Sequence, residues 1–572
     1  MSSERNSLVA LGACQGLVLW LLTSPWADAA GPAVRVALAS FVCASALVLH
    51  FAWTGGDRTR LLWLALGVGA LYAAVSFWIA WQLPRTDEPF QGDERRWATW
   101  LPCAGLSLFA LGPFLQIHLR TRALRFPYAE LFANAASNGL VAAVAATFVG
   151  ALWVVLGLWA ALFGLVKIAL FQDLFTTPAF AWVVTGSAAA LGISIGRENV
   201  RATELLRRVT PLTQHVLPPL VSFVAVLFLG SLAFTGLDPL WQQPYASGLV
   251  LGWMALHGLL LNAAFADGSG PPPASRALRA LVSAGVLTLP AYGAIAVYGL
   301  GLRIGQRGLS PLRFWGALVA VVALCVGLGY AVSVLRRGRG WLHTLPGANR
   351  TLALAAVALA LATHTPVLDP LRWSARDQLR RLVDGIVPAG EFDYGFLRYE
   401  LGRAGDRALT ELAGLTAHGE LASVHDGVAR VRAAKNYGEW QSQLVQLRAE
   451  DIYVREPDRP LPPALLEAIA REGNAYQWQG CRLNQRCSAV RIELDQEPGP
   501  EWIVLFDTGS RKHVSIFGAS AGTFSQRGSL DASEEGAAAL DAALRAGRFE
   551  TVAPRWRDVR IDGALYRVVE SR

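Results

Sequence analysis

Residues 351–385 read TLALAAVALALATHTPVLDPLRWSARDQLRRLVDG, and the chain changes character within this stretch. The first part, 351–368, is apolar and long enough to cross a bilayer. The second part predicts an amphipathic junction helix over residues 370–385, with Asp369 as its N-cap and Pro370 at its first position. One face of this helix is apolar and consists of Leu371, Ala375, Leu379, Leu382 and Val383.

The charge balance differs on the two sides of this junction. Residues 1–369 hold 24 Lys plus Arg and 14 Asp plus Glu, a net charge of +10, whereas residues 370–572 hold 27 and 29, a net charge of −2. These values agree with the net charge of +8 for the whole chain. The excess positive charge therefore belongs to the apolar half. Because the polar half carries no basic stripe, we expect no nucleic-acid partner.

The apolar half contains eleven runs long enough to span a bilayer. They are residues 8–22, 34–53, 61–83, 97–119, 139–165, 178–196, 216–236, 246–266, 277–302, 314–335 and 351–368. We therefore expect an all-α polytopic membrane bundle over residues 1–369, followed by the junction helix and a small soluble α+β domain over residues 386–572.

The loops between these runs alternate in charge. One set carries sixteen Arg residues, and the other carries seven Arg and Lys167. The positive-inside rule puts the richer set in the cytoplasm, so the N-terminus is expected inside and, after an odd number of spans, the C-terminal domain outside. Only three of the 51 basic residues are Lys, which with abundant Ala and Gly is typical of a GC-rich bacterial genome. The expected location is the inner membrane, with a periplasmic C-terminal domain.

Two loops carry clusters of arginine. Residues 197–215 predict a basic interfacial helix that is broken at Pro211. Four side chains of this loop are candidates for binding the head groups of anionic phospholipids, namely Arg197, Arg201, Arg207 and Arg208. The alternative is that these residues only set the topology.

The second loop, 303–313, reads RIGQRGLSPLR and lies on the side predicted to be outside. Its three arginines run against the topology rule, so we expect phospholipid phosphates or acidic groups of the C-terminal domain to hold them. Ser310 and Pro311 can start the next helix as its N-cap and first residue.

Four segments resemble a bacterial family of polytopic membrane proteins, domain-of-unknown-function family 4153. They are residues 298–316, 368–385 and 392–405 and the LPPL of 217–220. The resemblance covers roughly residues 170–410. It implies the architecture but no catalytic residue. In the loop it marks Arg303, Gln306, Gly308, Pro311 and Arg313, and in the junction helix Ser374, Arg376, Gln378, Arg381, Leu382 and Gly385. We take Arg303, Gln306, Arg313, Ser374, Arg376, Gln378 and Arg381 as the candidate functional surface.

In the polar half, residues 386–475 predict helices, including short ones at 396–401, 407–415 and 462–472. After residue 475, alternating apolar residues predict mostly antiparallel strands, with a helix over 533–546 between them.

Two candidate motifs in this half, one for catalysis and one for metal binding, lack the neighbouring residues or spacing that such a site requires. Residues 518–522 match G-x-S-x-G, but no helix and no later His follow, so a glycine-rich hairpin loop is the prediction. His418, Glu420, His425 and Asp426 match no zinc spacing. We expect no metal and no cofactor.

The cysteines carry a further prediction. Cys14, Cys43, Cys103 and Cys325 fall in apolar runs, whereas Cys481 and Cys487 are the two cysteines of the polar half. Because we expect that half outside the cytoplasm, where disulfides persist, the sequence predicts a Cys481–Cys487 disulfide.

The leading functional interpretation is a non-enzymatic envelope sensor, scaffold or accessory subunit whose periplasmic domain binds a protein partner. One alternative is a transporter of a lipid or small molecule, although no carboxylate lies in mid-membrane, where coupled transporters usually have one. The other is an envelope-modifying enzyme with active groups near Arg303 and Arg376.

Overall fold

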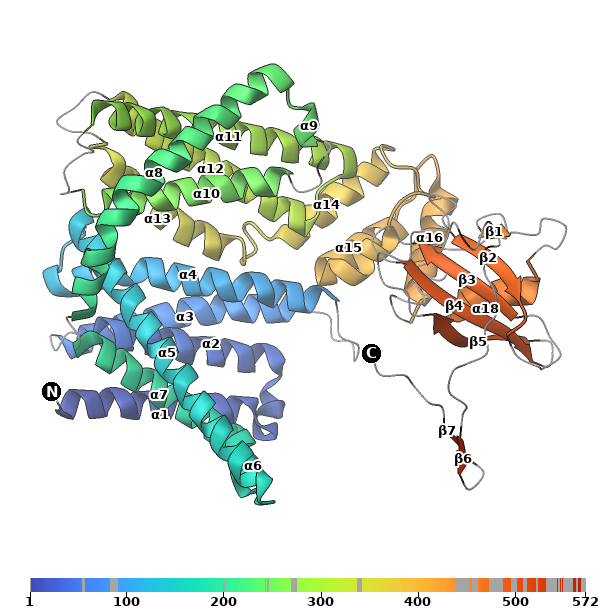
Figure 1. Cartoon of the computed structure of the whole chain (residues 1–572), viewed down its shortest axis with the longest axis horizontal. Coiled ribbons are helices and arrows are strands. Elements are labelled where there is room, and N and C mark those ends of the chain that lie inside the picture. The colour runs from blue at the N-terminus through green and yellow to red at the C-terminus, as the bar shows by residue number, and fades with distance from the viewer. Residues whose placement is uncertain are drawn as a thin grey trace. The chain divides into compact units, whose positions relative to one another are not determined.

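A computed structural model of the chain, shown in Figure 1, divides into two compact units, Met1–His425 and Asp426–Arg572. It describes residues 2–53, 57–82, 91–198, 201–241, 243, 246–268, 275–336, 342–435, 437, 440, 452–454, 461–472, 487–494, 501–507, 512–520, 523–530, 543, 546, 548, 559–561 and 564–566. The two units are treated separately below.

Among the described residues, eleven helices are long and apolar enough to cross a membrane, which confirms the number predicted from the apolar runs. This is the composition of a multi-pass membrane protein. The helices are α1 (Ser2–Thr23), α2 (Pro32–Ala52), α3 (Arg58–Gln82), α4 (Gln91–Thr121), α5 (Tyr128–Leu165), α7 (Pro178–Glu198), α8 (Arg201–Thr235), α10 (Ala246–Phe265), α11 (Arg276–Arg307), α12 (Pro311–Leu335) and α13 (Leu345–Ala362).

Shorter elements connect or follow these helices. In the first unit they are η1 (Pro25–Ala30), α6 (Leu170–Thr176), α9 (Asp238–Trp241), α14 (Pro370–Val383), the π-helix η2 (Phe396–Glu400) and α15 (Gly402–Ala413). Helix α16 (Leu421–Ala433) crosses the division between the units, and α18 (Pro463–Glu472) belongs to the second.

The spanning helices form two groups of neighbours (Figure 1). Helices α1–α4 and α7 lie side by side, as do α10–α13, and α4 packs against α13. Helices α5 and α8 run obliquely across these groups (Figure 1). The 38 residues of α5 rise about 57 Å, well beyond a hydrocarbon core of about 30 Å, and an oblique path accommodates that length.

Close backbone contact joins α1 to α7. A methyl group added at Gly12 would overlap the carbonyl oxygen of Gly186, and one at Gly16 would overlap that of Trp182. The G-x-x-x-G spacing of α1 thus permits a helix contact that larger residues would prevent. The same spacing at Gly248 in α10 faces open space, so spacing alone does not identify a contact.

The last spanning helix begins and ends six residues earlier than predicted, at Leu345 and Ala362 instead of 351 and 368. The polar Leu345–Arg350 turn can be helical because its proline lies in the first turn, where a missing N–H costs no bond. At the other end, the hydroxyl of Thr363 donates to the carbonyl oxygen of Leu359 (2.9 Å) and a turn follows.

Residues 386–425 lie in the same compact unit as the membrane helices, although the sequence placed them in the soluble domain. The guanidinium of Arg403 in α15 lies 4.3 Å from the centre of the Trp81 ring at the end of α3. The apolar face of α15, including Leu409 and Leu412, is buried. Because that face packs on α14 and α3, this segment is fastened to the bundle.

The second unit contains a five-stranded sheet in the order β1-β2-β3-β4-β5, formed by β1 (Ile452–Val454), β2 (Cys487–Ile492), β3 (Glu501–Asp507), β4 (Lys512–Ser520) and β5 (Thr523–Leu530). A separate hairpin joins β6 (Val559–Ile561) and β7 (Ala564–Tyr566). All pairings are antiparallel except that of β1 with β2, which agrees with the predicted α+β pattern. The predicted helix over 533–546 falls largely outside the described residues.

The core of this unit lies between α18 and one face of the sheet. Leu465 and Ile469 of α18 are fully buried in one cluster with Val504 and Phe506 of β3. Residues 518–520 of the G-x-S-x-G match are the last three of β4, and Ser520 pairs with Thr523 at the start of β5. Strand β5 follows in place of the helix that a nucleophile elbow needs after its turn, which confirms the predicted hairpin.

We predict that Gly16→Ala lowers the melting temperature of the purified protein by several degrees, because overpacking at a backbone contact costs about 1–3 kcal/mol. Gly248→Ala is the matched control, since it makes the same change in open space. Differential scanning fluorimetry in one detergent compares the two. Equal melting temperatures for Gly16→Ala and Gly248→Ala would show that α1 and α7 do not pack as described.

Candidate functional site

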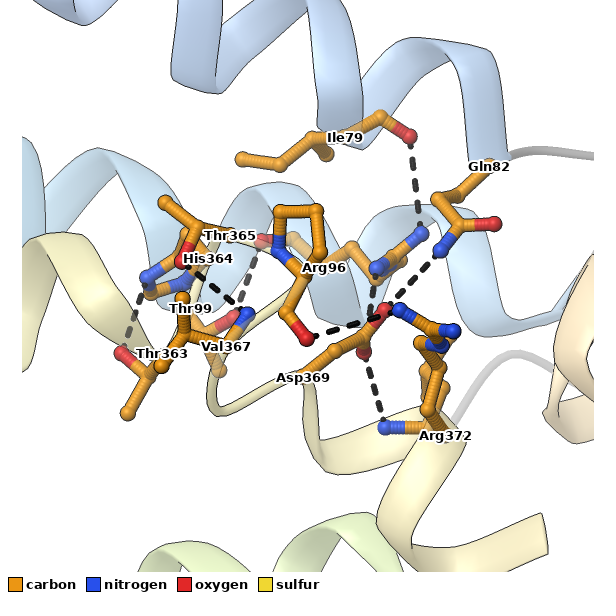
Figure 2. Close-up of polar contacts among 12 residues, drawn as sticks. Ile79, Gln82, Arg96, Thr99, Thr363, His364, Thr365, Val367, Asp369 and Arg372 are labelled. Carbon is orange, nitrogen blue, oxygen red and sulfur yellow. Dashed lines mark hydrogen bonds and ion pairs between the residues drawn. The ribbon is translucent and has the colours of Figure 1, made fainter.

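A buried carboxylate marks the point where the chain leaves the membrane helices. Asp369 is only 1% exposed and caps α14, with its Oδ1 accepting from the backbone N–H of Leu371 (3.0 Å). This confirms the predicted N-cap. Its Oδ2 accepts from Nε2 of Gln82, the last residue of α3 (2.9 Å), and Nη2 of Arg96 in α4 lies 3.6 Å from Oδ1 (Figure 2).

Arg96 connects three helices through this carboxylate. Its side chain is 12% exposed, and its Nη1 donates to the carbonyl oxygen of Ile79 near the end of α3 (3.4 Å). A buried ion pair contributes little net stability when it is intact, but removing one partner costs about 3–5 kcal/mol. The start of α14 is therefore fixed to α3 and α4.

An aromatic enclosure adjoins the ion pair. The His364 ring lies between Trp100 of α4 (5.0 Å between ring centres) and Trp315 of α12 (5.3 Å). Its Nδ1 lies 2.8 Å from the carbonyl oxygen of Ala360. The Trp100 indole donates to the hydroxyl of Ser76 in α3 (2.9 Å). These rings pack the turn before α14 between the two groups of spanning helices.

The middle of α14 holds the loop between α11 and α12. Asp377 accepts from the backbone N–H of Leu309 (2.7 Å), and Gln378 donates to the Leu309 carbonyl oxygen (3.0 Å). Gly308, the residue before Leu309, has φ +74°, and a methyl group added there would overlap Nε2 of Gln378. A residue other than glycine would meet both backbone strain and this overlap.

Arginine side chains cap the end of α11 in this same region. Arg381 donates to the carbonyl oxygens of Gly305 (3.1 Å) and Gln306 (3.2 Å). Arg313 donates to those of Gly308 (2.8 Å) and Arg307 (3.2 Å). The last carbonyls of a helix lack intrahelical partners and carry partial negative charge, so a guanidinium with several donors satisfies them.

The structure thus brings Arg313, Gln378 and Arg381 together, along with the backbone of Gln306. It separates the remaining members of the predicted surface. Arg303 donates away from the loop, to the carbonyl oxygen of Gln243 (3.1 Å). Arg376 is exposed, and Ser374 is buried with a hydroxyl that has no partner among the described residues. Backbone carbonyl oxygens accept from two of the three loop arginines, Arg303 and Arg313.

The apolar face of α14 was predicted largely correctly. Leu371, Ala375 and Leu382 are buried, and Leu379 is partly buried. Val383 is 42% exposed, so it does not belong to that face. The helix ends as expected, with a glycine at 385 in the left-handed conformation (φ +70°).

Of the four arginines predicted to bind lipid head groups, the structure describes the side chain of Arg197. Arg197 donates to the backbone carbonyl oxygens of His50 (2.9 Å) and Trp53, and thereby caps α2. Helix α8 begins at Arg201 and passes through Pro211, so the predicted break there is wrong. The side chains of Arg201, Arg207 and Arg208 lie outside the described residues.

Three of the residues considered above for zinc spacing, His418, Glu420 and His425, contact nearby backbone. His418 Nε2 lies 3.0 Å from the carbonyl oxygen of Leu382, and Glu420 accepts from the backbone N–H of Ala389 (2.7 Å). His425 Nε2 lies 3.1 Å from the carbonyl oxygen of Leu415. No cluster of three or more His, Cys, Asp or Glu suited to a metal occurs in the part of the chain that the structure describes.

Sequence reasoning missed Gln82, Arg96 and Asp377 as members of this site. Gln82 and Arg96 meet Asp369 across more than 270 residues of chain, which no local pattern reveals. One signal was present: Arg96 directly precedes an apolar run on the side where the charge rule disfavours arginine. The contacts of α14 with α3, α4 and the α11–α12 loop can hold these helices together. Among the described residues, the polar atoms of this site mostly pair with one another and with backbone.

No family model matches the chain, and no curated protein or solved structure is significantly similar to it. The resemblance to family 4153 therefore stays a prediction.

We predict that Asp369→Ala destabilises the protein by about 3–5 kcal/mol, because it leaves Arg96 buried without its partner and removes the cap of α14. Arg122→Ala is the control, because its ion pair with Asp57 is exposed and is worth no more than about 1 kcal/mol. Thermal unfolding of both variants is the measurement. A double variant, Arg96→Ala with Asp369→Ala, should be less destabilised than the sum of the single changes. Strict additivity would show that the pair does not interact.

Proposed function

We propose that the protein is a non-enzymatic envelope sensor, scaffold or accessory subunit of the bacterial inner membrane. Its N-terminus lies in the cytoplasm, and its C-terminal unit lies in the periplasm and binds a protein partner. The observation that carries this proposal is the double attachment of α14. Asp369 ties its start to α3 and α4, and Asp377, Gln378 and Arg381 tie its middle to the α11–α12 loop.

Such attachment gives the chain a rigid exit from the membrane. A displacement of α14 would have to break the Asp369 contacts and those of Asp377 and Arg381 together. Helix α15 continues this rigid region through the stacking of Arg403 on Trp81. A sensor or scaffold needs this mechanical continuity between its spanning helices and the segment that leads to its partner-binding unit.

The enzyme alternative gains no support from the arginines on which it was based. Arg303 donates to the carbonyl oxygen of Gln243, and Arg376 is exposed. The arginines that do converge, Arg313 and Arg381, donate to the end of α11. The transporter alternative gains one observation, an apolar groove among the spanning helices whose lining has two carboxamides, Gln116 and Asn138.

A photo-reactive amino acid placed at Tyr453 in intact cells tests partner binding, because this side chain on β1 is 42% exposed. We expect a crosslink to one discrete second protein, and none from the buried position Leu505. The proposal is contradicted if neither Tyr453 nor the exposed Leu494 gives a crosslink. It is also contradicted if the purified protein moves lipids or solutes across proteoliposomes.

Labelling of single cysteines tests the orientation, in a variant in which all six native cysteines are replaced by alanine. In intact spheroplasts, an impermeant maleimide should label Glu411→Cys and should label Arg125→Cys only after lysis, because the two exposed sites lie on opposite sides in the proposed topology. The reverse pattern would place the C-terminal unit in the cytoplasm.

The proposed periplasmic location includes the Cys481–Cys487 disulfide. Cys487 is buried at the start of β2, whereas Cys481 lies outside the described residues. A ring this small would add about 2 kcal/mol in the loop-entropy model. Peptide mass spectrometry without reduction should recover the two cysteines in one linked peptide, and two alkylated free thiols would contradict the bond.

A further inference from the structure

An apolar groove lies among three spanning helices, α2, α4 and α5, and has a volume of about 290 Å³. Its walls include Leu47 and Phe51 of α2 and Phe109 of α4. Gly105 and Gly112 leave space along the α4 side, seven residues apart and thus on one helix face. The one strongly polar feature of its lining is a pair of carboxamides, Gln116 and Asn138.

The groove opens toward the bilayer. Leu47 is 40% exposed and Phe109 is 44% exposed, and a methyl group added at Gly105 would meet no atom within 4 Å. Because α2, α4 and α5 are all spanning helices, the surroundings of this opening are lipid tails. The occupant must therefore be an apolar chain that belongs to the membrane.

The length of the groove matches one leaflet. Gly105 and Gln116 are eleven residues apart on α4, which corresponds to about 16 Å along the helix. The hydrocarbon core is about 30 Å thick, so this distance is close to half of it. Gln116 lies five residues before the end of α4, or about 7.5 Å of helix rise. The carboxamide end is thus near the membrane surface, and the glycine end is near the mid-plane.

The carboxamide pair leaves one donor available to a ligand. Gln116 Nε2 donates to the carbonyl oxygen of Phe51 (2.9 Å) and to Oδ1 of Asn138 (2.9 Å), which uses both of its N–H groups. Asn138 Nδ2 donates to Oε1 of Gln116 (3.2 Å), and its second N–H has no acceptor among the described residues. A methyl group at Gly112 would lie 3.5 Å from this nitrogen, so the nitrogen borders the groove.

Positive charge surrounds the same end of the groove. The loops that join α2 to α3 and α4 to α5, with their flanking residues, carry five arginines and two carboxylates, a net charge of +3: Arg58, Arg60, Arg120, Arg122, Arg125, Asp57 and Glu130. Arg125 is exposed. Arg120 pairs with Glu130 and Arg122 pairs with Asp57, so the net positive charge falls on Arg58, Arg60 and Arg125. An anionic head group placed above the carboxamides would be attracted by these three.

We propose that this groove binds one acyl chain of an anionic ester-linked glycerophospholipid from the arginine-rich leaflet. The chain lies along Gly105 and Gly112, the ester carbonyl oxygen accepts from Asn138 Nδ2, and the phosphate lies near the arginines of the two loops. The inference is independent of the proposed sensor or scaffold function, since it concerns a lipid held within the bundle.

Native mass spectrometry of the full-length protein with added phosphatidylglycerol tests the site. Gly105→Leu fills the groove and should weaken binding by about tenfold or more, because the leucine excludes about two or more methylene groups. Gly150→Leu is the matched control, since it adds the same side chain at an exposed glycine on α5 with open space around it. Equal affinities of wild type and Gly105→Leu would show that the bound lipid is only a surface annulus and would overturn the proposal.

Two lipid variations with the wild-type protein keep the test independent of folding. Ether-linked phosphatidylglycerol lacks the ester carbonyl and should bind about fivefold more weakly, the effect of one net hydrogen bond. Phosphatidylethanolamine should also bind more weakly, because its head group has no net charge. Equal binding of the ether lipid would refute the contact with Asn138, and equal binding of phosphatidylethanolamine would refute the selection for an anionic head group.

Discussion

A carboxylate withdrawn from water at the end of the membrane region is the constraint on which the junction depends. Buried charge is tolerated only when it is paired and hydrogen-bonded. Asp369 meets this requirement with Arg96, Gln82 and the first turn of α14. These partners come from two spanning helices and from the junction helix. The direction in which the chain leaves the bundle is therefore fixed by electrostatics as well as by packing.

A second theme is the use of arginine to close the ends of neighbouring helices. Arg35 donates to the carbonyl oxygen of Leu22 at the end of α1 (2.8 Å), Arg197 caps α2, and Arg381 caps α11. A guanidinium presents several donors in a fixed plane, so it can satisfy two adjacent carbonyls, which an ammonium does less well. Capping accounts in physical terms for Arg35 and Arg313, which lie in loops where the positive-inside rule disfavours arginine. Their number reflects helix capping as well as orientation.

Local sequence signals predicted much of the fold. Eleven apolar runs correspond to eleven helices of spanning length among the described residues, because length and hydropathy are properties of contiguous residues. The caps of α14 at Asp369 and of α12 at Ser310 were also predicted, because an N-cap depends on its own first turn. The three-residue strand β1 was missed, because it exists through parallel pairing with β2 and has too few residues to show a pattern.

The candidate site was predictable only in part. The resemblance identified Gln378, Arg381 and Gly308, which do meet, but it gave no reason for the meeting. Asp377 supplies part of that reason, because its carboxylate binds the backbone of the loop. Pairings between distant segments follow from the tertiary arrangement, which a single sequence does not encode in any local period. The groove between α2, α4 and α5 was not predicted either, because it is formed by helices that are brought together only in the tertiary structure.

Hydrogen–deuterium exchange of α14 in lipid nanodiscs tests the rigid junction most directly. Opening of this helix must break the contacts of Asp369 and those of Asp377 and Arg381 together. The account therefore predicts that amides in the interior of α14 exchange at least about a thousandfold more slowly than an unstructured peptide, an opening free energy of about 4 kcal/mol. Exchange within about tenfold of the unstructured rate would show that α14 is not fixed to the membrane helices, and would contradict the account.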